Sequence, residues 1–237
     1  MWGRGFREAQ IPIRYHIPMR IAFFGGSFDP PHLGHLAVAQ AAQQALALDQ
    51  VLFAPVGLQP LKPRGSSASF KDRAAMVQLA IASEPKFTLS LLDAPKPGQT
   101  TPNYTFETLQ QLRETHPDDT ELFLLLGADS LRTFHHWHRA AEIPFLAQLI
   151  VASRPKESLS SLQTLMPPSI SIEPSSNRPN TYHLANPSGA QSQLTLLPNL
   201  HYEISATALR KTMKSSTSPQ QIPPTVLEYI HQHRLYR

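Results

Sequence analysis

Two histidines, His32 and His35, stand three residues apart around a glycine in the segment GGSFDPPHLGH, residues 25–35. Positions i and i+3 in the first turn of a helix share a face, so both imidazoles can donate N–H groups to one phosphoryl group. Gly25 and Gly26 let the backbone approach a ligand closely. The segment lacks the spacing of a GxGxxG fingerprint or of a P-loop, and no third ligand completes a zinc site. It therefore predicts a different phosphate-handling turn, and the alternative is a simple strand-to-helix turn with incidental histidines.

A second candidate phosphate site lies far along the chain, in the segment ISATALR at residues 204–210. Ser205 can cap a helix that begins there, and Arg210 then lies in its second turn. A guanidinium offers phosphate oxygens a planar fork of donors. Arg210 alone could be a solvated helix charge, but with Ser205 and Thr207 at this spacing we favour a phosphate-binding role.

Short apolar runs alternate with helical patterns along most of the chain, and the histidine segment joins the first run to the first helix. This alternation predicts an α/β fold, with a doubly wound open parallel sheet covered by helices on both faces. In such a sheet, ligands bind at the carboxyl ends of strands, where helix N-termini offer free N–H groups. The predicted strands are 20–24, 51–55, 87–92, 122–126 and 148–152, and the predicted helices are 33–48, 70–83, 104–115, 158–165, 204–214 and 223–233. We expect Met76, Leu79, Ala80, Val226, Leu227 and Ile230 to face the core.

The chain divides into an irregular N-terminal extension, residues 1–18, and a single domain, residues 19–237. Met19 stands directly before the first strand, so it could be the true initiator, and otherwise the leader is a loose extension. Prolines interrupt residues 155–199, which we expect to form an excursion that is mostly loop after one short helix.

The composition of the 237-residue chain excludes several kinds of functional site. The absence of cysteine rules out disulfides, thiolate metal sites and cysteine nucleophiles. The longest apolar stretch, residues 122–128, is too short to span a bilayer, and the first residues lack the apolar segment of a signal peptide, so we expect a cytoplasmic protein without membrane contact. The net charge of +4 is scattered, which favours small phosphate ligands over nucleic acid.

The segment GGSFDPPHLGHL resembles the HxGH signature of the nucleotidylyltransferase superfamily, and ISATALR resembles its ISxTxxR signature. Within the superfamily the chain resembles the nicotinate-nucleotide adenylyltransferases over about residues 20–237. His32 stands where the pantetheine-phosphate branch usually has threonine, and NYTFETL resembles the SYTxxTL segment of the family. GADSL followed by Trp137, the pair Arg154-Pro155 and the ending VLEYI…LY also fit. The resemblance implies a Rossmann-like nucleotidyltransferase fold.

The resemblance also implies a reaction, in which ATP transfers AMP to nicotinate mononucleotide and gives deamido-NAD and pyrophosphate in NAD biosynthesis. His32 and His35 would hold the α-phosphate, and Arg210 would grip the β- and γ-phosphates. Mg²⁺ would accompany ATP, without a dedicated carboxylate site in the protein. The other ATP-binding candidates that it implies are Gly25, Gly26, Ser27, Phe28, Gly34, Lys62, Ser205 and Thr207.

For the nicotinate nucleotide, the resemblance implies that Trp137 stacks on the ring and that Asp129 accepts hydrogen bonds from the ribose or its surroundings. Backbone N–H groups near Phe106 and His138 would receive the ring carboxylate, which favours nicotinate over nicotinamide because a carboxylate only accepts. Trp137 could instead be a core aromatic residue. Tyr104 and Thr105, which complete this set of candidates, could be helix-entry residues.

The sequence departs from the family pattern near Lys62, where Leu61 replaces the usual histidine of PPHK or PPHR. Arg64 could assist Lys62, and Arg73 is either a further candidate or a helix surface charge. His135, His136 and His138 flank Trp137, but adjacent helical positions point apart, so we predict no metal site there.

Two alternatives stay open, and the sequence does not indicate an oligomeric state. A sister enzyme would use another acceptor, such as phosphopantetheine, FMN or nicotinamide mononucleotide. A non-catalytic nucleotide-sensing module on the same fold would bind nucleotide without releasing pyrophosphate.

Overall fold

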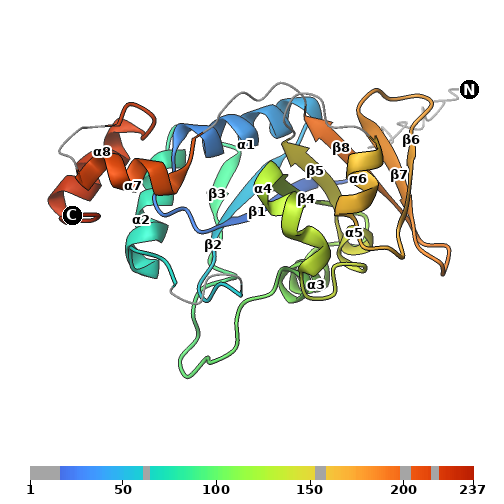
Figure 1. The fold of residues 1–237 in the computed structure, drawn as a ribbon, viewed down its shortest axis with the longest axis horizontal. Helices are drawn as coiled ribbons and strands as arrows, with labels where there is room; N and C mark the ends of the chain where they lie inside the picture. Colours follow the sequence, from blue (N-terminus) through green and yellow to red (C-terminus); the bar gives the residue numbers. More distant parts are fainter. Residues whose placement is uncertain (1–16, 61–64, 153–158, 198–203, 215–218) are drawn as a thin grey trace, which may run out of the picture.

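The computed structural model describes residues 17–60, 65–152, 159–197, 204–214 and 219–237. An eight-stranded sheet runs through the molecule in the order β3-β2-β1-β4-β5-β8-β7-β6 (Figure 1). The strands from β3 to β8 in this order are parallel, whereas β7 and β6 are antiparallel to their neighbours. The bounds are β1 Arg20–Gly26, β2 Gln50–Pro55, β3 Phe87–Leu89, β4 Glu121–Gly127, β5 Gln148–Ala152, β6 Ser171–Pro174, β7 Thr181–Ala185 and β8 Gln191–Leu197.

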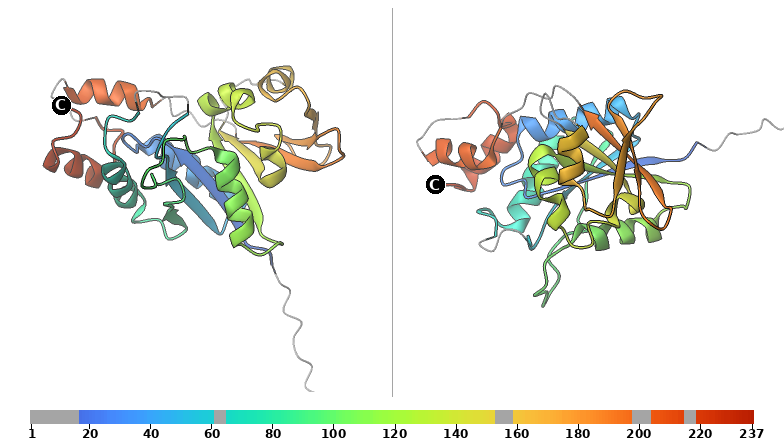
Figure 2. Two further views of the ribbon diagram at one scale, coloured as in Figure 1. Left: turned by 90° about the horizontal axis from the view of Figure 1, so that it is seen from below. Right: turned by 45° about the vertical axis from the view of Figure 1, so that its right-hand side comes forward.

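Helices cover both faces of the sheet, as predicted. One buried cluster joins the sheet to α1 Leu33–Ala45, α2 Phe70–Ile81, α7 Ala206–Lys214 and α8 Pro224–Gln232. The opposite cluster joins it to α3 Thr105–Thr115, α4 Ala128–Thr133, α5 Ile143–Leu146 and α6 Leu159–Leu165. In Figures 1 and 2, α2, α7 and α8 lie together at one end of the molecule and β6 and β7 at the other. None of the helices described is long and apolar enough to cross a bilayer.

Strand β4 shows why the central strands are continuous apolar runs in the sequence. Leu122, Leu124 and Leu126 enter the cluster beneath α3 to α6, while Phe123 and Leu125 enter the cluster beneath α1 and α2. A strand that is buried on both faces needs an apolar residue at every position. The five predicted strands all exist, and β5 has the predicted bounds.

The prediction of mostly loop after residue 165 is wrong. Strands β6, β7 and β8 form an antiparallel extension of the sheet there, and β8 also pairs in parallel with β5. Few apolar side chains suffice for this extension, since Ile172, Leu184 and Leu194 bury only one face. Pro174 is compatible with it because it ends the edge strand β6, where a missing backbone donor has little effect. Residues 1–16, 153–158 and 198–203 lie outside the described residues.

The prediction that Leu79 faces the core is also wrong, because the residue is 36% exposed. Met76 and Ala80 are buried as predicted. The buried stripe of α2 continues through Val77 and Ile81, which places Leu79 at its margin. On α8, Val226 and Ile230 are buried as predicted, and Leu227 packs against the same cluster while partly exposed.

Candidate active site

The turn between β1 and α1 fixes both histidines. His32 is the N-cap of α1, and its backbone N–H donates to Nδ1 of His35 at 3.2 Å. Burial and the neighbouring His32 hold the pKa of His35 well below its usual value, so the ring is neutral near pH 7. Because Nδ1 accepts a hydrogen bond, the single ring proton resides on Nε2. His35 therefore presents an N–H donor at the far edge of its ring.

His32 stacks on His35, with 3.6 Å between the ring centroids and 22° between the planes. Burial lowers the pKa of His32 to about 4. A Cβ on Gly34 would lie 3.1 Å from Nδ1 of His32, so a larger residue there would press on the stacked ring. Nδ1 of His32 is buried without a hydrogen-bond partner among the described residues. Such an atom is rare in folded proteins.

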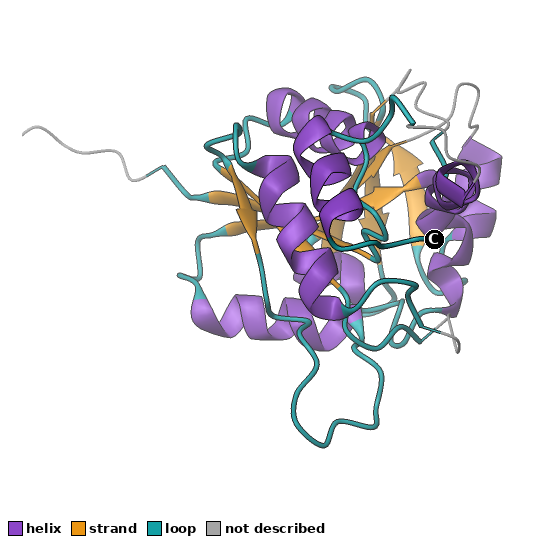
Figure 3. Ribbon diagram, turned by 90° about the vertical axis from the view of Figure 1, so that its left-hand side faces the viewer, coloured by secondary structure: helices purple, strands orange, loops and turns teal. Residues whose placement is uncertain are grey.

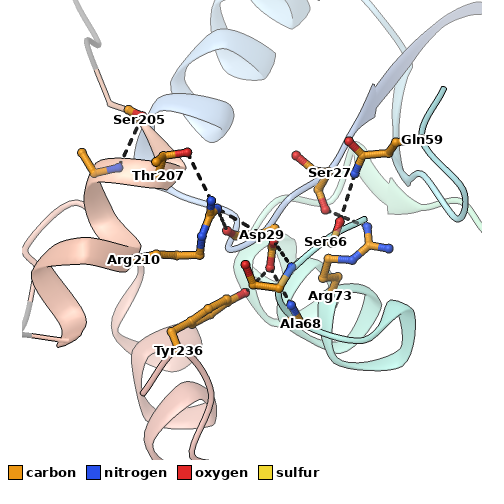
Figure 4. Close-up of polar contacts among 12 residues, drawn as sticks. Ser27, Asp29, Gln59, Ser66, Ala68, Arg73, Ser205, Thr207, Arg210 and Tyr236 are labelled. Carbon is orange, nitrogen blue, oxygen red and sulfur yellow. Dashed lines mark hydrogen bonds and ion pairs between the residues drawn. The ribbon is translucent and has the colours of Figure 1, made fainter. Parts of the chain in front are cut away.

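Asp29, three residues before His32, ties the turn to distant segments (Figure 4). Its buried carboxylate accepts hydrogen bonds from Ser67 N at 2.6 Å, from Ala68 N at 3.0 Å and from the Tyr236 hydroxyl at 2.8 Å. Its backbone carbonyl accepts a hydrogen bond from Nη1 of Arg210 at 2.7 Å. Four regions of the chain thus meet at one residue of the turn.

Arg210 is not a solvated helix charge. Besides its bond to Asp29, its Nη2 donates to Oγ1 of Thr207 at 3.2 Å, and only 24% of its side chain is exposed. Ser205 caps α7 as predicted, because its hydroxyl accepts from Ala208 N at 3.4 Å. The two signature segments that the sequence separates are therefore in contact.

Arg73 is neither a surface charge nor exposed enough to grip a ligand, since it is 2% exposed. Its Nη1 donates to the carbonyl of Ser27 and its Nη2 to the carbonyl of Val56, each at 2.8 Å. Burial lowers the pKa of Arg73 from its usual value, and the nearby Asp29 opposes this shift. Arg73 thus holds the β1–α1 turn against the end of β2. Lys62, Leu61 and Arg64 lie outside the described residues, and the role of Lys62 stays a prediction.

A cavity of about 390 Å³ lies beside the same turn, at the carboxyl ends of β1 and β4. Eight of the predicted site residues line it, namely Gly25, Gly26, Ser27, Tyr104, Thr105, Asp129, Trp137 and His138. His32, His35 and Arg210 do not line it. Gly25–Ser27 connects the cavity to the histidine turn, so the predicted residues form two adjoining groups. Phe28 belongs to neither wall, since its buried ring packs 4.9 Å from the ring of His35.

Trp137 fits both predicted alternatives, because it lines the cavity and also packs against the core. Its indole N–H donates to Oγ1 of Thr133 at 3.3 Å, which fixes the ring. Beside it, the rings of Tyr104 and His138 lie 4.6 Å apart, and Nε2 of His138 is 3.1 Å from Oε1 of Glu107. These rings offer a flat aromatic ligand a wall to stack on.

The remaining predicted residues of this group surround the cavity in different ways. Tyr104 and Thr105 open α3 as helix-entry residues and also line the cavity. Asp129 lines the cavity, and its Oδ1 lies 3.0 Å from Nη1 of Arg132. The Phe106 side chain is in the core instead, with the guanidinium of Arg139 3.6 Å above its ring. Only its backbone can fulfil the predicted role.

Sequence reasoning missed Asp93, which also lines the cavity and is 5% exposed. The Thr108 hydroxyl donates to its Oδ1 at 2.6 Å. Burial raises the pKa of Asp93 to about 6, against the opposing effect of the Thr108 bond. Asp93 directly follows the predicted strand 87–92, so its position at a carboxyl strand end was the available signal. Asp93 lies in the segment between β3 and α3, residues 90–104, which projects from the molecule (Figure 3).

The side chains of His135 and His136 differ from the expectation that adjacent residues here point apart. Their rings do not point apart but lie 3.8 Å from each other, because side-chain rotation can turn neighbouring rings together. Within the part of the chain that the structure describes, no group of three or more His, Asp or Glu side chains could hold a metal ion.

The parallel sheet, the histidine turn at the first helix and the arginine returning from α7 define a nucleotidyltransferase of the Rossmann-like class. Residues 23–212 match the family described as cytidylyltransferase-like. The chain belongs to this family and, within it, to the nicotinate-nucleotide adenylyltransferases.

Its relatives match nearly the whole chain. The probable nicotinate-nucleotide adenylyltransferase of Trichlorobacter lovleyi is 36% identical over 92% of this chain and 100% of its own length. The protein of the same description from Synechococcus sp. (strain JA-3-3Ab) is 38% identical over 92% and 94%. Among solved structures, Plasmodium falciparum nicotinic acid mononucleotide adenylyltransferase complexed with NaAD aligns with a TM-score of 0.67. That alignment covers 92% of this chain and 97% of the other at 18% identity, so it shows a shared fold.

Proposed function

We propose that this protein transfers AMP from ATP to nicotinate mononucleotide, giving deamido-NAD and pyrophosphate in NAD biosynthesis. The observation that carries the proposal is the hydrogen bond from Arg210 to the carbonyl of Asp29, across 181 positions of sequence. It brings the ISxTxxR arginine to the turn that holds both histidines. The curated relatives of the preceding subsection carry this activity in their descriptions.

On the ATP side, the neutral histidines act as preorganised hydrogen-bond donors. The Nε2–H of His35 and the ring of His32 meet the α-phosphoryl oxygens as negative charge builds on them, aided by the N-terminus of α1. Arg210 takes the β- and γ-phosphates, with Ser205 and Thr207 beside it. A guanidinium has five N–H donors, and the two bonds to Asp29 and Thr207 leave it able to bind phosphate.

On the acceptor side, the cavity takes the nicotinate nucleotide. Its ring stacks on Trp137, and its carboxylate accepts hydrogen bonds from backbone N–H groups near Phe106 and His138. The phosphate of the nucleotide then attacks the α-phosphorus in line, and pyrophosphate leaves. The protein's contribution is to hold two anions in position against their repulsion.

Mg²⁺ would travel with ATP and neutralise its oxygens. This ion usually keeps several waters and needs few protein ligands. The cytoplasmic location and the lack of nucleic-acid partners stay predictions from the sequence.

The test is pyrophosphate release from ATP and Mg²⁺ with a panel of acceptors. We expect release with nicotinate mononucleotide and much less with nicotinamide mononucleotide, phosphopantetheine or FMN. Strongest release with another acceptor would establish a sister enzyme instead. ATP binding without release for any acceptor would establish a nucleotide-sensing module.

A further inference from the structure

The chain ends one residue after Tyr236, and the hydroxyl of that tyrosine donates to Oδ1 of Asp29 across 207 positions of sequence. We propose that Tyr236 is a positioning residue for AMP transfer, which acts by orienting Asp29 and through it the histidine turn. This inference rests on the proposed function, since it concerns the rate of that reaction. It assigns a role to the C-terminal tyrosine, which lies outside the HxGH and ISxTxxR segments.

The tail is shaped to make this contact. Helix α8 ends at Gln232, and the following residues fold back, with Leu235 N donating to the carbonyl of Ile230 at 3.0 Å. Arg234 and Tyr236 both have positive φ, 54° and 63°. Residues other than glycine rarely adopt this conformation, because their Cβ crowds the backbone. Contacts at the end of the tail must therefore offset this strain, and the bond to Asp29 is one of them (Figure 4).

Asp29 is placed to transmit an effect to the reacting groups. Its carbonyl holds Arg210, so rotation of this residue moves the guanidinium assigned to the triphosphate. The preceding Phe28 has φ of 45° and packs against His35, so the turn has little freedom to absorb such a movement. Only 4% of Asp29 is exposed, so water cannot readily replace a lost donor.

The hydroxyl is suited to a constant rather than a switching role. Burial and the adjacent Asp29 raise the pKa of Tyr236 above its usual value, so the phenol stays protonated at neutral and mildly alkaline pH. Tyr236 therefore donates its hydrogen bond to the carboxylate without titrating near neutral pH.

The chain contains a matched control in Tyr229. Its hydroxyl also donates to a carboxylate, Oδ1 of Asp72 at 3.0 Å, and it also belongs to the C-terminal segment. Asp72 lies in the first turn of α2 and has no bond to the histidine turn. Tyr229→Phe thus removes the same chemistry from the same region without touching Asp29.

We would measure kcat and both KM values for Tyr236→Phe and Tyr229→Phe, with folding checked by circular dichroism and thermal melting. We expect kcat to fall about tenfold in Tyr236→Phe, as loss of one bond to a charged group can cost, while KM for nicotinate mononucleotide stays within about twofold. Tyr229→Phe should keep kcat within about twofold of the wild type. Equal kcat in the two variants would overturn the proposal, as would a Tyr236→Phe enzyme that loses only melting temperature.

A second pair of variants guards against misfolding of the first. A chain that lacks Tyr236 and Arg237 should reproduce the loss of kcat, and a chain that lacks only the exposed Arg237 should not. Equal rates in this pair would also overturn the proposal. The wild type is assayed in parallel, and absence of transfer there would refute the proposed function itself. Transfer to another acceptor would move the same comparison to that acceptor.

Discussion

The two sides of the turn after β1 are built in opposite ways. On the histidine side, Asp29 and Arg210 are bonded to groups from distant segments, and the rings of His32 and His35 stack on each other. On the cavity side, rings and carboxyl groups line an accessible volume, and the indole of Trp137 packs against the core and donates one hydrogen bond. The difference matches two tasks, because charge in a transition state needs donors fixed in advance, whereas a flat ring must enter and leave.

Burial shifts the pKa of a titratable group toward its neutral form on both sides, but with opposite consequences for stability. Burial lowers the pKa of His32 to about 4 in the folded protein. The free energy of unfolding therefore falls as the pH drops from the pKa of His32 in the unfolded chain toward 4. Burial raises the pKa of Asp93 to about 6 in the folded protein. The free energy of unfolding therefore falls as the pH rises from the pKa of Asp93 in the unfolded chain to about 6.

We expect the largest effect from a substitution in the histidine turn. His35→Ala should lower kcat on the order of a hundredfold or more, because one preorganised donor to the transition state is lost. Steady-state kinetics with ATP and nicotinate mononucleotide would measure it, with His231→Ala on the exposed end of α8 as control. Near-wild-type kcat in a folded His35→Ala protein would remove His35 from the mechanism.

The second largest expected effect is on the free energy of unfolding, which the buried carboxyl of Asp93 lowers when it ionises. Asp93→Asn keeps an acceptor for Thr108 but cannot ionise, so its gain in unfolding free energy over the wild type should grow with pH. The gain should level off above the native pKa of about 6, at no more than about 3 kcal/mol for a shift of about two units. Urea unfolding across this range would test it, with the exposed Glu228→Gln as control. A gain that does not change with pH would show that the pKa of Asp93 is not raised in the folded protein.

Arg210→Ala tests whether the histidine side binds ATP. We expect KM for ATP to rise about tenfold to a hundredfold, the range for lost bonds to a charged group, with KM for nicotinate mononucleotide nearly unchanged. Initial-rate measurements with each substrate varied in turn would separate the two. An unchanged response to ATP would remove Arg210 from the site.

The smallest expected effect lies on the cavity side. Trp137→Ala should raise Kd for nicotinate mononucleotide by about tenfold at most, which is the usual value of one aromatic stack. Trp137→Phe should recover most of the affinity, since it keeps a stacking face. Calorimetric titration with the nucleotide would measure both, and equal affinity in all three proteins would show that Trp137 is only a core residue.

The sequence predicted the parts of the molecule that depend on local pattern. Strand β4 is recognisable because both its faces are buried, and the capping role of Ser205 is recognisable from its spacing to the helix. The partners of Arg73 and Tyr236 were not predictable, because these side chains bond to groups that only the tertiary fold brings near. Strands β6 to β8 were missed since prolines near them suggested loop and since β6 and β7 have few buried residues.

A crystal structure with a non-hydrolysable ATP analogue and nicotinate mononucleotide tests the central claim most directly. We predict an α-phosphoryl oxygen within about 3 Å of Nε2 of His35, Arg210 on the same triphosphate and the pyridine ring against Trp137. A triphosphate bound away from His35, or contacts of His32, His35 and Arg210 to different molecules, would contradict the account.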